Sequence, residues 1–234
     1  MYRVLPAPVR NRVLEICFKT PPILAGFSWP GERAVACHLQ RGVAKSTCEN
    51  LNAADLGICV ADYQRELPFP PASFDLVICH RSLDRLAAED DSFRDPRALE
   101  AFIARASNVL AAGGILAVCA TNATAITRWR RRWGRHKSSI SDLAAGSLSP
   151  AGWRKLLMRS GLQRTQSFMV LPDADAPLRL VNTDTDLSRI GFRREIESIR
   201  ASLSFPGYLL RRALVEMSLY RHLEESVLAW GHRS

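Results

Sequence analysis

The 234-residue sequence lacks any apolar run approaching the ~20 residues that a membrane-spanning helix requires. It also lacks the composition of disordered or collagen-like chains, because apolar residues make up 47% and charged residues 24% of it. The first residues, MYRVLPAPVRNRV, contain no apolar signal core followed by a small-residue cleavage site, so we expect a cytoplasmic protein. The length suits one large globular domain.

Several short catalytic and metal-binding motifs are also absent. The sequence contains no GxSxG nucleophile elbow, no phosphate-binding P-loop and no HExxH zinc motif. None of the six cysteines stands at CxxC spacing, which removes support for zinc ribbons and thioredoxin-like sites. Five cysteines lie in short apolar runs and only Cys48 falls in a polar stretch. We therefore expect buried, reduced cysteines and no metal.

The apolar runs that are present show little alternation, which is typical of parallel strands covered on both faces. A helix over Leu99–Leu110, stopped by a turn at Ala111–Gly114, fills one of the gaps between them. Strand, helix and strand in this order form a right-handed crossover, so the pattern predicts a doubly wound α/β sheet. We predict five such strands: Val13–Cys17, Ala34–His38, Ile58–Asp62, Phe74–His80 and Ile115–Ala120.

We divide the chain into an α/β core over residues 1–172, which includes a basic loop over 121–147, and a C-terminal part over 173–234 of the same domain. After the basic loop, Ser149–Trp153 begins a helix that Gly161 caps. Gln166–Leu171 then forms a strand.

The C-terminal part is predicted as a helical elaboration with a last strand. A loop over 173–188 leads into helices over Ile190–Glu225 that are interrupted at Phe205–Gly207, and Ser226–Gly231 forms the strand. An apolar stripe is expected to dock these helices on the core: Leu209, Leu210, Leu214, Met217 and Leu223.

The net charge of +9 is concentrated in one segment, Thr127–Lys137, which carries six of the positive charges. On a helix Trp129 and Trp133 share a face, and arginines surround them: Arg130, Arg131 and Arg132 among others. A solvated amphipathic helix that packs on the domain is one interpretation. A site for an anionic small molecule or a protein partner, and a membrane-surface helix, are alternatives. Nucleic acid is the least favoured.

Two segments carry a family pattern. Leu67–Leu86 reads LPFPPASFDLVICHRSLDRL, and residues 98–122 read ALEAFIARASNVLAAGGILAVCATN. Over roughly residues 12–171 the chain resembles the class I S-adenosylmethionine-dependent methyltransferases, especially those of small molecules. This resemblance implies a Rossmann-like sheet of order 3-2-1-4-5 with an antiparallel C-terminal strand. It also implies an S-adenosylmethionine site at the carboxyl ends of the first strands.

The glycine-rich turn that the family places after its first strand is missing. Where the family reads VLEIGCGTG, this chain has Cys17, Lys19 and Pro21 at the three glycine positions. Glycine there lets the backbone pass close beneath the cofactor, and a side chain fills that space. Glu15 matches the family, and we expect it to bond the loop amides.

His38 stands where the family has the acidic residue that accepts hydrogen bonds from the ribose hydroxyls. A neutral imidazole can accept one hydrogen bond, but it cannot bind both hydroxyls as a carboxylate does. Asp62, near the family's adenine position, persists. Because each lost charged or bidentate hydrogen bond is worth about 1.5–3 kcal/mol, the affinity for the cofactor should fall by orders of magnitude. The candidate cofactor-binding residues, vestigial or atypical, are therefore these: Glu15, Cys17, Lys19, His38 and Asp62.

Lys19, His38 and His80 should surround one opening, because each follows the end of a strand on the same edge of the sheet. They could accept a phosphate or carboxylate, or simply fill a vestigial crevice. A metal is disfavoured because neighbouring residues such as Cys79 and His80 point to opposite faces of a strand. His80, on the family's substrate side, is the candidate catalytic base.

Two functions follow from these patterns. The first is a methyltransferase-like protein that has lost normal S-adenosylmethionine binding and serves as a non-catalytic partner or regulatory subunit, or binds another anionic ligand. The alternative is an active S-adenosylmethionine-dependent methyltransferase of a small or anionic substrate, with the cofactor in an unusual pose over Cys17–Pro21.

Overall fold

The structure is a computed structural model of the full chain. It describes residues 12–17, 33–38, 56–61, 66–80, 82–83, 95–123, 148–171, 179–183, 190, 193–194, 196–197, 205–216 and 226–234. Every structural statement below refers to these residues.

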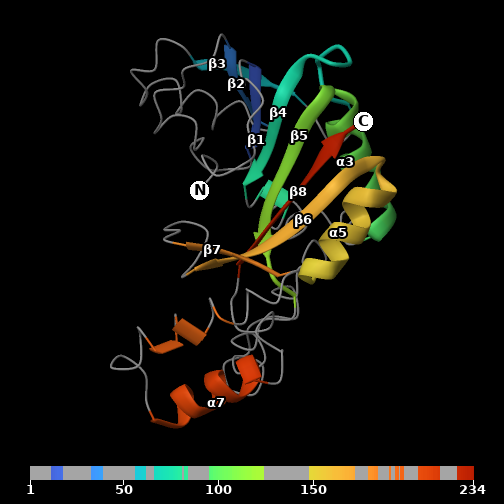
Figure 1. The fold of residues 1–234 in the computed structure, drawn as a ribbon. Helices are drawn as coiled ribbons and strands as arrows, with labels where there is room; N and C mark the ends of the chain where they lie inside the picture. Colours follow the sequence, from blue (N-terminus) through green and yellow to red (C-terminus); the bar gives the residue numbers. More distant parts are fainter. Residues whose placement is uncertain are drawn as a thin grey trace.

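One mixed sheet of eight strands organises the molecule, in the order β3-β2-β1-β4-β5-β8-β6-β7 (Figure 1). The first five strands run parallel, which the continuous apolar runs predict, since such strands are buried on both faces. The predicted order 3-2-1-4-5 with an antiparallel C-terminal strand is confirmed. These five strands are β1 (Arg12–Cys17), β2 (Arg33–His38), β3 (Leu56–Val60), β4 (Phe74–His80) and β5 (Leu110–Thr121).

Three antiparallel strands extend the sheet beyond β5. The last strand, β8 (Ser226–Arg233), pairs with β5 on one side and with β6 (Leu162–Leu171) on the other. A further strand, β7 (Arg179–Asn182), pairs with β6 at the edge. The prediction of a loop throughout 173–188 is therefore wrong, because main-chain pairing with β6 makes 179–182 a strand.

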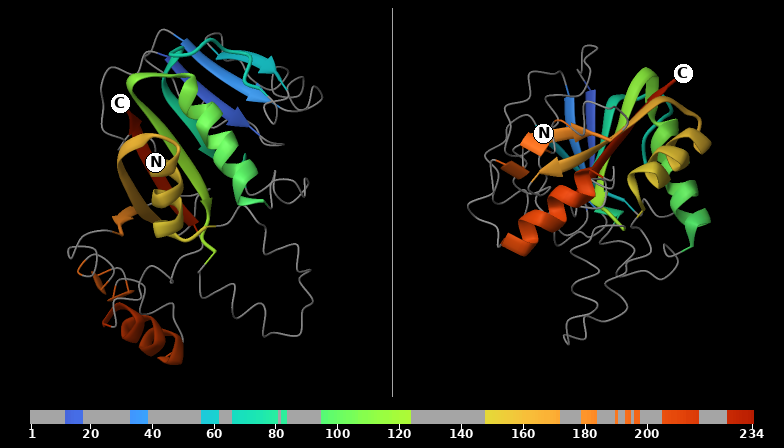
Figure 2. Two further views of the ribbon diagram at one scale, coloured as in Figure 1. Left: turned by 90° about the vertical axis from the view of Figure 1, so that its right-hand side faces the viewer. Right: turned by 60° about the horizontal axis from the view of Figure 1, so that its bottom comes forward.

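Two helices cover one face of this sheet, as Figure 2 shows. The first, α3 (Pro96–Asn108), begins at Asp95, whose side chain accepts a hydrogen bond from the backbone N–H of Arg97 at 2.9 Å. The second, α5 (Pro150–Arg159), begins in the same way at Ser149, as its sequence predicts. Both have proline at the first helical position, where the missing N–H costs nothing.

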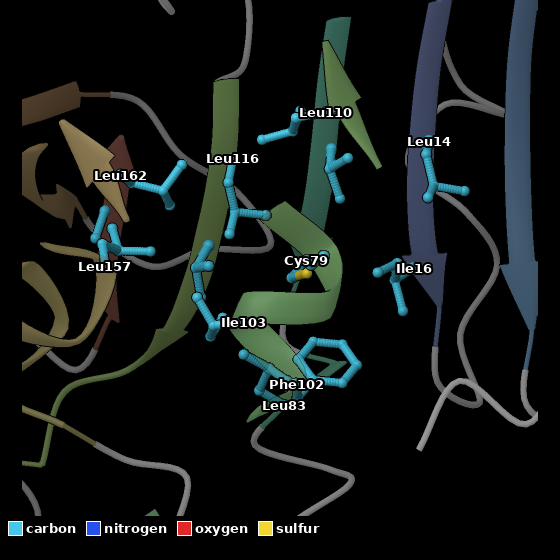
Figure 3. Close-up of a cluster of buried hydrophobic side chains, with 14 of the residues drawn as sticks. Leu14, Ile16, Cys79, Leu83, Phe102, Ile103, Leu110, Leu116, Leu157 and Leu162 are labelled. Atoms are coloured by element: carbon cyan, nitrogen blue, oxygen red, sulfur yellow. The ribbon is translucent and has the colours of Figure 1, made fainter. Parts of the chain in front are cut away.

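The main core lies between these helices and the sheet. Phe102 and Ile103 of α3 meet Ile16 of β1 and Cys79 of β4 there, and all four side chains are fully buried (Figure 3). A smaller cluster, built on Leu76, Ile78 and Trp230, covers the opposite face of the sheet. Successive side chains of each central strand thus point to opposite faces and belong to two different cores.

The link between α3 and β5 differs from the prediction. The helix ends at Asn108 and β5 starts at Leu110, so Ala111–Gly114 lies inside the strand instead of forming a separate turn. The register explains the difference: Phe74 pairs with Leu110, but Leu76 pairs with Ile115, so the four residues form a bulge opposite Asp75. Gly113 takes a φ of +73° within it.

The C-terminal helix α7 (Phe205–Glu216) lies beyond the carboxyl ends of β4 and β5 (Figure 1). It starts at Phe205–Gly207, where the prediction placed a break, because Pro206 fits the first turn of a helix. Tyr208 and Val215 are buried, but Leu209 is 48% exposed and Phe205 70% exposed. The prediction that Leu209 helps to dock this helix on the core is therefore wrong. None of the described helices is long and apolar enough to cross a membrane.

Candidate functional site

The carboxyl ends of the parallel strands bring three candidate residues to one edge of the sheet. Cys17 of β1 pairs with His38 of β2, and His38 pairs in turn with Val60 of β3. One step earlier, Ile16 lies between Cys37 of β2 and Cys79 of β4. The side chains of residues 38 and 80 therefore stand at equivalent heights on either side of β1, as the predicted topology requires.

Alternation along the strands separates the cysteines from the histidines. Cys37 and Cys79 belong to the core beneath α3. His38 and His80, each one residue further on, therefore project from the other face. No group of three or more His, Cys, Asp or Glu side chains among the described residues could hold a metal ion.

Cys17 stands at the first of the family's three glycine positions and is 2% exposed. Its Sγ donates to the backbone carbonyl of Glu15 at 3.8 Å. Burial and the neighbouring Glu15 raise the pKa of the Cys17 thiol far above its ordinary value, so the group stays protonated at neutral pH. A neutral side chain therefore fills the place where the family has bare backbone.

Glu15 is itself buried in the middle of β1. Its charge adds to the effect of burial on Cys79, whose pKa rises to about 12. Burial, with a smaller contribution from Glu15, thus keeps the thiols of Cys17 and Cys79 in their neutral form. Its predicted bonds to loop amides concern the loop after β1, which lies outside the described part of the chain.

His38 is buried as completely as the core residues, with 1% of its surface exposed. Neither ring nitrogen has a hydrogen-bond partner among the described residues. Burial lowers the pKa of the imidazole below its ordinary value of 6.5, because a charged ring would lose its hydration there. His38 is therefore a neutral ring without the acceptor pair that an acidic residue offers.

His80 ends β4, pairs with Cys119 of β5 and is half-buried. Its position suits the predicted role of a base on the substrate side, which stays a prediction. Ser82 follows close by and is 2% exposed. His80 is thus more exposed than Cys79 before it or Ser82 after it.

The remaining predicted site residues lie outside the described part of the chain: Lys19, Asp62, Trp129, Arg130, Arg131, Arg132 and Trp133. The chain on either side of the basic loop is described. Asn122 and Leu148 form a parallel bridge, and the N–H of Ala123 donates to the carbonyl of Leu148 at 3.3 Å. The basic loop therefore leaves and rejoins the described structure at one place, next to the carboxyl end of β5.

A pair of thiols emerges that the sequence analysis did not identify. Cys37 and Cys59 are register partners on β2 and β3, and their side chains are in hydrogen-bonding contact. The sequence offered only part of the signal, because it placed Cys37 in the strand Ala34–His38 and Cys59 in its predicted neighbour Ile58–Asp62. The pairing depends on the observed bounds of β3, Leu56–Val60, in which Cys59 is the penultimate residue.

The chain matches the family profile of the methyltransferase domain over residues 23–118. The chain has the fold of the class I S-adenosylmethionine-dependent methyltransferases, as the resemblance of its motifs indicated. A search of curated protein sequences finds no significant match.

Solved structures share the fold at low identity. A possible histamine N-methyltransferase from Thermotoga maritima has a TM-score of 0.57 and 13% identity, over 100% of this chain and 85% of that one. A methyltransferase from Archaeoglobus fulgidus has a TM-score of 0.57 and 12% identity, over 96% and 86%. A structure of the Haloferax volcanii Trm112 methyltransferase activator with its methyltransferase has a TM-score of 0.56 and 15% identity, over 98% and 85%.

S-adenosylmethionine is the cofactor that this family implies. The described residues do not fit its usual position. Cys17 is a buried side chain at the position where the resemblance places the first glycine, and His38 is a buried, uncharged ring where it places the ribose-binding carboxylate.

Proposed function

We propose that this protein is a non-catalytic member of the methyltransferase family, which does not hold S-adenosylmethionine in the family's usual mode and serves as a partner or regulatory subunit. One observation carries the proposal: the groups at the ends of β1 and β2, Cys17 and His38, are both buried and both uncharged. A cofactor that carries a sulfonium and a ribose diol needs acceptors and space at these two points.

The energetic argument concerns the ribose contact first. A carboxylate that accepts two hydroxyl hydrogen bonds contributes about 1.5–3 kcal/mol per charged bond. A neutral imidazole can accept one hydrogen bond at most. The replacement at residue 38 therefore costs roughly one to two orders of magnitude in affinity before the side chain of Cys17 is considered.

A protein partner is part of the proposal. One similar structure pairs a methyltransferase with an activator protein, which supports a partner role for a chain of this fold. The basic segment Thr127–Lys137 is the proposed contact, for an acidic partner surface or an anionic small molecule. We also propose a cytoplasmic setting, which agrees with the free thiols of all five described cysteines.

An active methyltransferase is the second candidate, and one observation favours it. The two ring nitrogens of His38 have no partner within the described residues, and a ribose hydroxyl could donate to one of them. In that case the cofactor would lie across Cys17 in an unusual pose, with Asp62 near the adenine and His80 near the acceptor.

Restoring the missing acid separates the two functions. S-adenosylhomocysteine is titrated into the wild-type chain and into the Cys17→Gly/His38→Asp double variant, with His38→Asn as the matched uncharged control. The proposal expects no saturable binding to the wild type or to His38→Asn, and measurable binding to the Cys17→Gly/His38→Asp double variant. Micromolar binding to the wild type that His38→Asn weakens supports the active enzyme and overturns the proposal.

A further inference from the structure

The thiols of Cys37 and Cys59 lie on one face of two neighbouring strands. The residues are paired in the parallel register of β2 and β3. Cys37 belongs to the core beneath α3, and Cys59 packs against that same core, so both side chains point the same way. Neighbouring strands lie about 4.8 Å apart, which is within the Cα separation of about 4.4–6.8 Å that disulfides span.

The two cysteines differ in their access to solvent. Cys37 is fully buried, whereas Cys59 is half-buried and lies on β3, the edge strand of the sheet. Cys59 is therefore the more open of the two residues to a small oxidant in solution. The pair has one accessible thiol and one sheltered neighbour, an arrangement that suits a reactive thiol with a resolving partner.

The electrostatics of the pair favour the same assignment of roles. Hydrogen bonding by the Cys37 thiol lowers the pKa of Cys59, because the bond stabilises the thiolate. The same contact, together with burial, raises the pKa of Cys37. Cys59 is the better nucleophile of the two, and Cys37 remains a thiol that can donate its proton.

We propose that Cys37 and Cys59 form a reversible dithiol–disulfide site that responds to hydroperoxides. The Cys59 thiolate attacks one oxygen of hydrogen peroxide, the O–O bond breaks, and Cys59 becomes a sulfenic acid as hydroxide leaves and is protonated to water. The Cys37 sulfur then attacks the Cys59 sulfur, the S–O bond breaks, and the hydroxyl leaves with the Cys37 proton as a second water. Two thiols are oxidised and one peroxide is reduced to two waters.

The geometry also makes the bond reversible. Cβ atoms of paired residues on parallel strands stand roughly one strand spacing apart, which exceeds the ~3.8 Å typical of disulfides. The strands must therefore shift slightly to close the bond, and such strained disulfides are readily reduced. Since His38 and Val60 follow these cysteines directly, oxidation ties the two strands together beside the candidate cofactor position.

Peptide mapping of the full chain tests this site. Trypsin leaves Cys37 in the peptide 34–41, but Cys48 and Cys59 together in 46–65, so the experiment uses a Cys48→Ser background. The reduced protein is treated with one equivalent of hydrogen peroxide, its remaining thiols are alkylated after denaturation, and the unreduced digest is analysed by mass spectrometry. The expected product is peptide 34–41 linked to 46–65, which dithiothreitol separates.

Variants identify the thiols involved. Cys59→Ser and Cys37→Ser should each abolish the link, and Cys59→Ser, at the half-buried edge position, keeps the test valid if Cys37→Ser fails to fold. Cys119→Ser, a fully buried cysteine in the core on the opposite face, is the control and should leave the link intact. Full alkylation of both thiols, accumulation of sulfinic acid at Cys59 without a link, or a link to another cysteine overturns the proposal. None of these outcomes depends on binding of S-adenosylmethionine.

Discussion

Arg12 and Asp75 clamp the start of β1 to the start of β4. The Oδ1 of Asp75 accepts from Nη2 of Arg12 at 2.7 Å, and its Oδ2 accepts from the backbone N–H of Arg12 at 3.0 Å and from Nε at 3.3 Å. Asp75 belongs to the SFD segment of the family pattern. Its described role is therefore structural, since it fixes the strand that leads to the candidate site.

Removing the charge of Asp75 should destabilise the fold. Asp75→Asn keeps the shape of the side chain but loses the charge-assisted bonds, and we expect a loss of about 1–2 kcal/mol in the free energy of unfolding. Denaturant unfolding at neutral pH measures this. The control is Glu216→Gln, which removes the exposed ion pair with Arg193 and should cost less than about 1 kcal/mol. Equal losses in the two variants would contradict the role of the clamp.

Two glycines in the sheet should respond differently to alanine. A Cβ at Gly231 of β8 would lie 2.9 Å from the Cβ of Leu162 and 3.0 Å from Thr165, so Gly231→Ala should cost about 1–3 kcal/mol. A Cβ at Gly57 of β3 meets its nearest atom at 3.4 Å, an ordinary contact, so Gly57→Ala should change stability little. Unfolding curves of both variants test the packing of β8 on β6, and a tolerated Gly231→Ala would contradict it.

The buried His38 should make stability depend on pH. Burial lowers its pKa in the folded state, so the unfolded chain binds more protons as the pH falls through its ordinary value of 6.5, and folding becomes less favourable. His38→Leu removes the ionisable ring and, with it, two buried nitrogens that have no partner among the described residues. At pH about 7 the free energy of unfolding of this variant should therefore be at least that of the wild type. The advantage of His38→Leu should grow towards pH about 5. A constant difference in unfolding free energy between these pH values would refute the account of His38.

Cys59 should be the first described thiol to react with an alkylating agent. Its pKa is lowered by the contact with Cys37, so at neutral pH it has a larger thiolate fraction than Cys17 or Cys79, whose pKa values burial raises. Brief treatment of the folded, reduced protein with iodoacetamide, followed by peptide mapping in the Cys48→Ser background, should label Cys59 ahead of the others. Earlier labelling of Cys79 would show that the solvent access inferred for β3 is wrong.

The parallel part of the fold could be predicted from the sequence because buried parallel strands leave continuous apolar runs. Helix ends with explicit caps, such as Ser149 and Gly161, were also predictable, since each cap satisfies backbone groups locally. The bulge at Ala111–Gly114 and the strand at 179–182 were not, because both depend on pairing with residues distant in the sequence. A glycine pair is compatible with either a turn or a bulge.

For the candidate site, the sequence predicted which residues stand at the strand ends but not their surroundings. Register alone places Cys17 beside His38, and this follows from the predicted topology. The loss of hydrogen-bond partners at His38 and the pairing of Cys37 with Cys59 depend on burial and on side-chain contacts across strands. These are properties of the packed sheet and not of any one segment.

The central claim is that the ends of β1 and β2 do not bind S-adenosylmethionine in the usual mode of the methyltransferase family. Calorimetric titration of the wild-type chain with S-adenosylmethionine, alongside Asp62→Ala, tests it most directly. The account predicts no saturable heat in either protein. Micromolar binding to the wild type that Asp62→Ala abolishes would contradict it.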